Sequence, residues 1–245
     1  MNAQRGESER IRLNQPRLSP EHGRLRLLVA TAMLLISFVL AGCASDEGPS
    51  STGTSSPTST PTTVPTASGL CAHEFTGCKI AAGTYSTAPF DHPFTFTIET
   101  EWENTRAWPD GGEIAPTPQV GAFQWGSGVA KGNVEGKVVP IGPKPADLIA
   151  HLRKFEGFNV GQPSPATIGG VLGQQLDVLT NETKAQAFLL SEKDAFNVAP
   201  GEKLRFFIFD RSGETVFLIV DAFKEADFDS FSAIVQPILD SIVWK

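Results

Sequence analysis

Two consecutive apolar runs near the C-terminal end constrain the fold of this chain more than any other stretch. Residues 204–209 read Leu-Arg-Phe-Phe-Ile-Phe, and residues 215–220 read Thr-Val-Phe-Leu-Ile-Val. Between them, Asp210 and Gly213 stand at the first and fourth positions that a type I turn favours, so the runs predict a β-hairpin. Because consecutive residues in each run are apolar, both faces of these strands must be buried. We expect them at the centre of a sheet that is covered on each side.

The other elements of the C-terminal part can be predicted from the spacing of its apolar residues. Short or alternating apolar runs predict further strands at residues 93–100, 122–126, 134–139 and 186–190, and residues 167–179 are predicted to form a hairpin with a tight turn at Gly169 and Gly170. Apolar residues three and four positions apart predict helices at residues 143–155 and 227–242. Residues 102–112, which Gly and Pro interrupt, are predicted to form a loop. Together these elements indicate a single globular α+β domain at residues 70–245, a mainly antiparallel β-sheet covered by helices on both faces.

Near the N-terminus, an uncharged apolar run at residues 27–40 follows Arg24 and Arg26. These fourteen residues would span about 21 Å of helix at about 1.5 Å per residue, less than the roughly 30 Å hydrocarbon core of a membrane. A basic flank and a short apolar core are typical of an export signal. We therefore predict a signal peptide at residues 1–42.

The residues that close this run, Leu40, Ala41, Gly42 and Cys43, resemble the lipobox of bacterial lipoproteins. In that class the cysteine thiol receives a diacylglyceryl group, a dedicated peptidase cuts just before it, and acyl chains such as palmitate hold the protein on the membrane. The resemblance implies a mature chain that starts at a lipidated Cys43 on the extracytoplasmic face of the cell membrane. The alternative is a chance match after an ordinary hydrophobic helix.

Residues 43–69 comprise the lipidated cysteine and a predicted linker. Of the twenty-six residues at 44–69, fourteen are Ser or Thr, and four prolines lie between them. A segment with so few apolar side chains cannot offset the entropy lost on ordering, so we predict that the linker is disordered. The same composition is typical of O-glycosylated stalks, and sugar attachment is a further hypothesis.

Besides Cys43, the chain has one pair of cysteines, Cys71 and Cys78. An even pair in an exported, oxidising setting predicts a disulfide that closes a short loop. The alternative is a metal or redox site, because His73 and Glu74 lie between the two cysteines. The six intervening residues and the lack of a second ligand pair do not match the usual zinc spacing, which favours the disulfide.

The charge of the mature chain excludes some partners. From Cys43 onward it contains 14 basic and 24 acidic residues, a net charge of −10 with His neutral. That balance argues against nucleic acid, whose phosphates need a basic surface. It also argues against electrostatic docking on anionic headgroups, which leaves the lipid as the membrane attachment.

The motifs of common exported enzymes are absent from the sequence. It contains no Gly-x-Ser-x-Gly elbow, no His-Glu-x-x-His pair, no Walker loop and no dinucleotide-binding glycine pattern. We therefore predict no catalytic residue, metal ligand or cofactor, although a glycosidase-like pair of carboxylates would leave no signature in the sequence. Trp102 and Trp108 flank the predicted polar loop and are candidates for the lip of a pocket, the alternative being core packing.

Three stretches of the domain carry a further resemblance: Gly83-Thr84-Tyr85 with 90–96 and Trp102, residues 168–178, and the Phe-rich hairpin with residues 238–242. They resemble a recurring kind of actinobacterial cell-envelope lipoprotein. The overall pattern is similar to the PsbP-like α/β sandwich, which serves as a non-catalytic assembly or accessory module. The resemblance covers about residues 80–245 and implies no catalytic residue.

The sequence thus predicts a membrane-anchored extracytoplasmic lipoprotein that serves the cell envelope as a non-catalytic binding or accessory module. Its partners would be the membrane, through the lipid on Cys43, and an unidentified envelope protein. One alternative is a carrier that holds a small apolar or lipid ligand in its aromatic core. A second alternative is a cell-wall hydrolase, which would need a cleft with two carboxylates of perturbed pKa.

Overall fold

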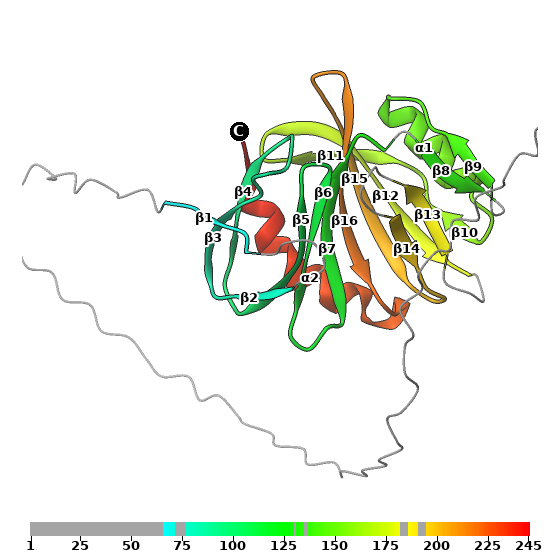
Figure 1. Ribbon diagram of the computed structural model, residues 1–245. Helices are drawn as coiled ribbons and strands as arrows, with labels where there is room; N and C mark the ends of the chain where they lie inside the picture. Colours follow the sequence, from blue (N-terminus) through cyan, green and yellow to red (C-terminus); the bar gives the residue numbers. More distant parts are fainter. Residues whose placement is uncertain (1–65, 72–76, 130, 135–136, 182–185, 191–194) are drawn as a thin grey trace, which may run out of the picture. The chain divides into compact units, whose positions relative to one another are not determined.

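The computed structural model describes residues 66–71, 77–129, 131–134, 137–181, 186–190 and 195–245 (Figure 1). All of them belong to one compact unit of the chain. The signal peptide predicted at residues 1–42, Cys43 and most of the linker predicted at 43–69 therefore lie outside the described residues.

The centre of this unit is a nine-stranded sheet in which every pair of neighbouring strands is antiparallel (Figure 1). Eight strands follow the order β10-β12-β15-β16-β7-β6-β5-β2, and β11 pairs with β12. Their bounds are β2 (Cys78–Ile80), β5 (Trp102–Trp108), β6 (Gly111–Pro116), β7 (Gly121–Ser127), β10 (Phe158–Val160), β11 (Ser164–Ile168), β12 (Val171–Thr180), β15 (Lys203–Arg211) and β16 (Glu214–Ala222).

The Phe-rich hairpin, β15 and β16, lies in the middle of this sheet. β15 pairs with β12 on its other side, and β16 pairs with β7. Phe206 and Ile208 face one side while Phe207 and Phe209 face the other, and each is at most 5% exposed. The predicted burial of these strands on both faces is therefore confirmed.

The turn of this hairpin differs from the predicted type I turn. β15 ends at Arg211 and β16 begins at Glu214, so Ser212 and Gly213 alone form the connection. Their φ angles are 58° and 85°, as in a type I′ turn, whose twist matches that of paired strands. Asp210 still supports the connection, because its carboxylate accepts a hydrogen bond from the Gly213 N–H at 2.9 Å.

A small sheet and a helix cover the first face of the central sheet. The sheet contains, in order, β1 (Ser68–Gly69), β3 (Gly83–Ser86), β4 (Phe94–Ile98) and β17 (Val243–Trp244). A 3-10 turn, η1 (Glu225–Asp227), leads into the helix α2 (Phe228–Asp240). The side chains buried here form what we call the first core, which includes Phe94, Phe96, Trp125, Phe209 and Phe231.

The second face is covered by the helix α1 (Pro145–Lys154) and by a sheet in the order β14-β13-β8-β9. These strands are β8 (Lys131–Val134), β9 (Lys137–Pro140), β13 (Gln186–Leu190) and β14 (Ala195–Val198). The side chains buried beneath them form the second core, which includes Leu152, Phe188, Phe196, Phe206 and Phe217.

The predicted architecture, a sheet covered by helices on both faces, is wrong. The described residues are mostly strand, and the two α-helices among them have only 10 and 13 residues. On each face a further four-stranded sheet lies in the covering layer beside one short helix. The spacing of apolar residues identifies both helices and, within the covering layers, the strands β4, β9 and β13. It does not show that they pair into separate sheets, because the remaining strands of these layers have only two to four residues, which is too short for a clear alternation of apolar and polar side chains.

The prediction of a loop at residues 102–112 is also wrong. These residues belong to the hairpin of β5 and β6, which Pro109 and Asp110 connect. A bulge between Asn104 and Arg106 shifts the register of β5, and such a shift interrupts the alternation by which a strand is recognised. The hairpin carries the site described next.

Candidate binding site

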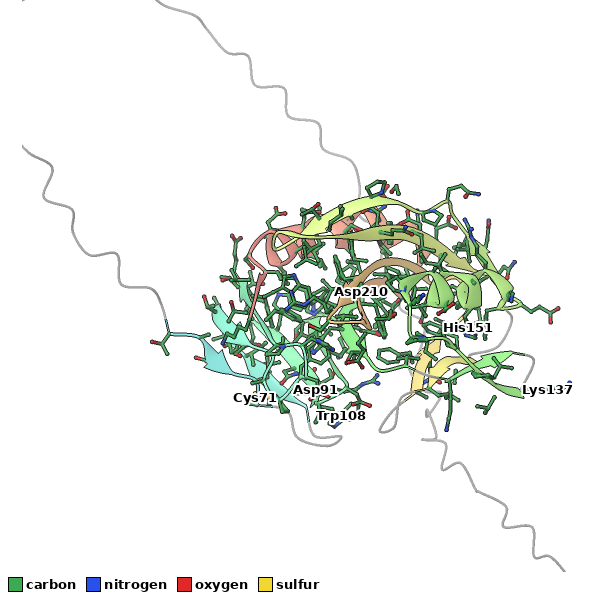
Figure 2. All side chains as sticks on the ribbon, turned by 90° about the horizontal axis from the view of Figure 1, so that it is seen from above. Cys71, Asp91, Trp108, Lys137, His151 and Asp210 are labelled. Carbon is green, nitrogen blue, oxygen red and sulfur yellow. A yellow bond between two sulfur atoms is a disulfide. The ribbon has the colours of Figure 1, made fainter. Side chains whose placement is uncertain are left out.

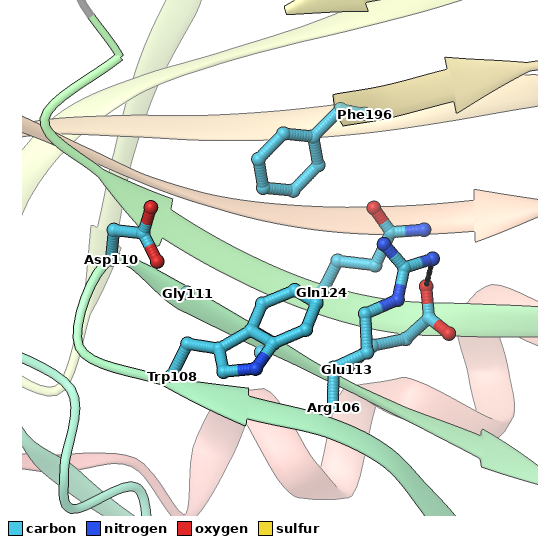
Figure 3. Close-up of a pocket in the computed structure, with 8 residues that line it drawn as sticks. Arg106, Trp108, Asp110, Gly111, Glu113, Gln124 and Phe196 are labelled. Carbon is cyan, nitrogen blue, oxygen red and sulfur yellow. Dashed lines mark hydrogen bonds and ion pairs between the residues drawn. The ribbon is translucent and has the colours of Figure 1, made fainter. Parts of the chain in front are cut away.

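A small pocket lies on the second face of the central sheet, at the turn of the β5–β6 hairpin (Figure 3). It is lined by Arg106, Trp108, Asp110, Gly111, Gly112, Glu113, Gln124 and Phe196. The two aromatic side chains are largely buried, with Trp108 7% and Phe196 8% exposed. The free space is about 10 Å³, close to what one water molecule needs. The pocket can therefore take the end of a chain but not a whole ligand of ordinary size.

Glycines of β6 and β7 allow an aromatic ring to pack close to the sheet beside this pocket. Gly111 of β6 and Gly126 of β7 are register partners. A Cβ atom added to Gly126 would lie 2.5 Å from Cζ of Phe217 and 3.0 Å from Cζ of Phe196, closer than carbon atoms pack in protein interiors. Glycine at this position therefore allows Phe196, which comes from β14, to approach the central sheet.

The charges of the pocket consist of one ion pair and one separate carboxylate. Arg106 Nη2 lies 3.2 Å from Glu113 Oε2, and the Arg106 guanidinium carbon lies 6.0 Å from the centre of the Trp108 ring. Both carboxylate oxygens of Asp110 are buried, and neither has a hydrogen-bond partner among the described residues. Figure 3 shows Asp110 at one end of the pocket and the Arg106–Glu113 pair at the other, with Trp108 between them.

A row of polar side chains continues from the pocket across the second face. Glu113 and Gln124 are register partners, and Gln124 Nε2 donates a hydrogen bond to Asp221 Oδ2 on β16 at 3.2 Å. Glu202, which directly precedes β15, is close enough to Asp221 for their charges to interact. We call Glu113, Gln124, Asp221 and Glu202 the polar row.

Burial changes the titration of two acids in the polar row. Asp221 is 2% exposed and Glu202 is 8% exposed. Desolvation raises the pKa of Glu202 to about 7, although a hydrogen bond with the Ala199 backbone opposes the rise. Desolvation also raises the pKa of Asp221 well above its ordinary value, and the charges of Glu202 and Glu113 raise it further. One oxygen of each acid lacks a hydrogen-bond partner among the described residues, so the neutral, protonated form is favoured at both positions.

The two tryptophans predicted as the lip of a pocket lie at opposite ends of β5. Trp102 is 2% exposed and belongs to the first core, whereas Trp108 lines the pocket on the second face. The bulge after Asn104 lies between them, and an inserted residue turns the following side chains to the other face of a strand. The structure therefore does not bring the two rings together.

Cys71 and Cys78 lie at disulfide distance, with their Cα atoms 6.1 Å apart. Cys78 begins β2, which pairs with β5 at the edge of the central sheet, and its side chain packs against the first core. Over the described ranges, no group of three or more His, Cys, Asp or Glu side chains is arranged to hold a metal ion. No helix in those ranges has the length and apolar character needed to cross a membrane.

Most residues of the pocket and the polar row are not predicted from the sequence. Asp221 carries a usable signal, because it directly follows the apolar run at residues 216–220 and continues its strand. An acid inside a strand that is buried on both faces must be paired or protonated. Phe196 carries no such signal, since its place in the pocket depends on how β14 packs over the central sheet.

Two further pockets flank the segment between β9 and α1. One, of about 410 Å³, is lined by residues of that segment and by Asp147, His151 and Lys154 of α1. The other, of about 220 Å³, is lined by residues that include Glu214 and Thr215. Figure 2 shows His151 well separated from Trp108, so the larger pocket is distinct from the one at the β5–β6 turn.

His151 is a core residue rather than an exposed ligand. It is 6% exposed, and its Nε2 lies 3.0 Å from the carbonyl oxygen of Phe188. Burial lowers the pKa of His151, and the hydrogen bond to Phe188 partly opposes this shift. The imidazole is therefore held neutral beneath α1 at physiological pH.

Comparisons with known proteins give limited information. No family model matches the sequence, and no curated protein matches it. The solution structure of cyanobacterial PsbP (CyanoP) from Synechocystis sp. PCC 6803 matches with 11% identity and a TM-score of 0.39, over 66% of this chain and 92% of that chain. The crystal structure of LpqN, involved in cell envelope biogenesis of Mycobacterium tuberculosis, matches with 10% identity and a TM-score of 0.29, over 71% of this chain and 92% of that chain. Because both TM-scores are below 0.5, neither likeness supports a conclusion about the function of this chain.

Proposed function

We propose that this chain is a membrane-anchored extracytoplasmic lipoprotein whose folded domain binds a partner of the cell envelope without doing chemistry. The lipobox resemblance at Cys43 supports the anchor. The binding role rests on one observation, the buried Asp110 carboxylate that lacks a hydrogen-bond partner among the described residues and lines a pocket. Such a group is stabilised when a bound partner supplies a donor.

The two acids with raised pKa values favour a structural role over catalysis. Asp221 and Glu202 are 2% and 8% exposed, and neither lines any of the three pockets described above. A glycosidase needs two carboxylates that flank a bound substrate. A substrate would reach this pair only if the covering layer moved, so the cell-wall hydrolase is the weaker alternative.

A carrier of a small apolar or lipid ligand is also less well supported than the proposed binding module. The largest described pocket, of about 410 Å³, is lined by α1 and the segment beside it rather than by the aromatic side chains of either core. Those aromatic side chains are closely packed, as the rings of Phe94 and Trp244 illustrate with centres 5.0 Å apart. A ligand in the aromatic core would have to displace them.

The anchor can be tested with the full chain in its own host. We expect wild-type protein in the membrane fraction with the mass of a lipidated chain that begins at Cys43. Cys43→Ser should retain the mass of the unprocessed precursor and carry no lipid. If Cys43→Ser is processed and fractionates like the wild type, the anchor part of the proposal fails.

The binding role can be tested by native mass spectrometry of the full chain extracted gently from membranes. We expect the mass of the lipidated protein alone or in complex with another protein. Asp110→Asn should reduce the amount of that complex, whereas Asp229→Asn, at an exposed acid of α2, serves as the matched control. An adduct of several hundred daltons that survives in Asp110→Asn would favour a lipid carrier instead.

A further inference from the structure

The pocket at the β5–β6 turn has the size of a single polar group. Its free space is about 10 Å³, near the minimum that holds one water molecule. A primary ammonium group is about as large as a water molecule and donates three hydrogen bonds. A guanidinium group is planar and carries its charge over four heavy atoms, so it needs more room.

The charge of the pocket also matches a single cation. Arg106 and Glu113 form an ion pair at 3.2 Å and offset each other, which leaves the Asp110 carboxylate as the net charge of the lining. Both of its oxygens are buried without a hydrogen-bond partner among the described residues. An isolated buried carboxylate is costly, and a cation that binds there removes most of the cost.

The position of Arg106 does not prevent a second cation from binding. Arg106 lies on β5 two residues before Trp108, whereas Asp110 lies in the turn beyond the end of that strand, so the two charged groups lie on opposite sides of Trp108 along the chain. Trp108 lies between them in Figure 3, and an indole ring attracts a cation near its face. A metal ion is a poorer match, because calcium needs six to eight oxygen ligands and no group of three ligating side chains occurs in the described ranges.

We propose that this pocket binds the ammonium end of a lysine side chain presented by a protein partner. The four-carbon stem of lysine would pass beside Trp108 and Phe196, whose rings offer it apolar contact. The net charge of −10 on the mature chain favours approach of a basic partner surface. This inference rests on the proposed binding role and names the group that the partner supplies.

The test is an NMR titration of the full chain, with the Trp108 indole N–H as the reporter, assigned by its loss in Trp108→Phe. The probe is Nα-acetyl-lysine amide, and the comparison probes are its Nε-acetylated form and Nα-acetyl-arginine amide. We expect a saturable shift at millimolar concentrations with the lysine probe alone. Asp110→Asn should weaken it at least tenfold, and Asp229→Asn, which makes the same charge change at an exposed site of α2, should not.

Three results would overturn the inference. An equal shift with the arginine or acetylated probe would show that the pocket does not select an ammonium group. An unchanged affinity in a folded Asp110→Asn would place the binding elsewhere, and the comparison of probes on the wild type remains decisive if that variant does not fold. No saturable shift with any probe would mean that the pocket holds water only. In that case, a complex detected by native mass spectrometry would still support the proposed function, so the two failures are distinguishable.

Discussion

The two faces of the central sheet are covered in the same way, by one short helix and one small sheet, but they differ in what they bury. On the first face, the fully buried amide of Asn104 donates to two backbone carbonyl oxygens at 2.9 and 3.0 Å. On the second face lie Asp221, Glu202 and His151, which are the buried titratable side chains of the described residues. The buried titratable side chains therefore lie on one side of the sheet, and that side can respond to pH through them.

β16 shows how one strand can carry apolar side chains to the first face and an acid to the second. Val216, Leu218 and Val220 belong to the first core, and Phe217 and Ile219 belong to the second. Asp221 follows Ile219 on the second face, because alternate residues of a strand share a face. Alternation thus allows an acid into the strand without any change in the packing of the first core.

The largest expected effect comes from removing one phenylalanine on each face. Phe209 and Phe217 are both 0% exposed, so Phe209→Ala and Phe217→Ala should each lower the free energy of unfolding by about 3–5 kcal/mol in urea titrations. Of the two, Phe217 packs against Phe196 at the pocket, with ring centres 5.2 Å apart. The Trp108 indole resonance should therefore shift in Phe217→Ala alone. If the Trp108 resonance shifts equally in both variants, a change in packing on one face is transmitted to the other.

The second face should make the stability of the domain depend on pH. The pKa of Glu202 rises from 4.5 to about 7 on folding, so the folded state binds this proton more tightly than the unfolded state. The resulting stabilisation is complete below pH 4.5 and is lost as the pH rises through 7. Between about pH 4 and pH 8 the loss should be about 3 kcal/mol from this group.

Glu202→Gln should remove the part of the pH dependence that Glu202 contributes, as measured by urea unfolding at both pH values, while Asp221, whose pKa burial also raises, keeps a contribution of the same sense. The lowered pKa of His151 acts in the opposite sense, because its contribution falls as the pH drops, so the informative quantity is the difference between variant and wild type. Glu156→Gln, at an exposed position, is the control. A variant that keeps the full pH dependence would contradict the assignment to Glu202.

The disulfide is expected to contribute less to stability than these core residues, and its effect should be confined to the edge of the central sheet. Cys71 and Cys78 are seven positions apart, and a crosslink that closes so short a loop contributes roughly 2–3 kcal/mol in the chain-entropy model. The double variant Cys71→Ser/Cys78→Ser should lose about that much stability and exchange its β2 amides faster. If reduction of the wild type leaves the unfolding midpoint unchanged, the crosslink has no such role.

The smallest expected loss of stability comes from replacing either of two glycines on adjacent strands. A Cβ on Gly112 would meet the Trp125 ring in the first core, while one on Gly126 would meet the rings of Phe217 and Phe196 on the second face. Gly112→Ala and Gly126→Ala should cost roughly 1–3 kcal/mol, with the greater loss for Gly112, since its Cβ would lie closer to Cζ2 of Trp125 than a Cβ on Gly126 would lie to its nearest atom, Cζ of Phe217 at 2.5 Å. If thermal unfolding shows a greater loss of stability for Gly126→Ala, the second face tolerates an added methyl group less well than the first, contrary to this prediction.

The central part of the fold follows from local patterns, whereas the covering layers do not. Apolar residues on both faces of β15 and β16 predict a buried hairpin, and the spacing in α1 predicts a helix with one buried side. The type I′ turn is missed because Ser212 adopts a positive φ angle, which its residue type does not announce. The covering sheets are missed, although β4 and β13 are predicted as strands, because pairing between distant segments, such as β17 with β4, assembles them.

The site is less predictable than the fold, because its residues become neighbours only through sheet pairing. Trp108 is singled out by its place beside a turn. Asp110 looks like an ordinary turn residue, and Glu113 looks like an exposed acid of a polar stretch. That they line one pocket depends on the bulge in β5 and on the packing of Phe196, and neither is encoded in a local motif.

The pairing of β1 with β3 has a mechanical consequence if the chain carries the lipid anchor that we propose. Ser68 and Gly69 pair in parallel with Tyr85 and Ser86, so tension from an anchor at Cys43 would enter the domain along a strand and load its hydrogen bonds in shear. Beyond β1, the same tension reaches the crosslinked pair Cys71 and Cys78 and passes through β2 into the edge of the central sheet. The domain would then be pulled by its most extensive sheet.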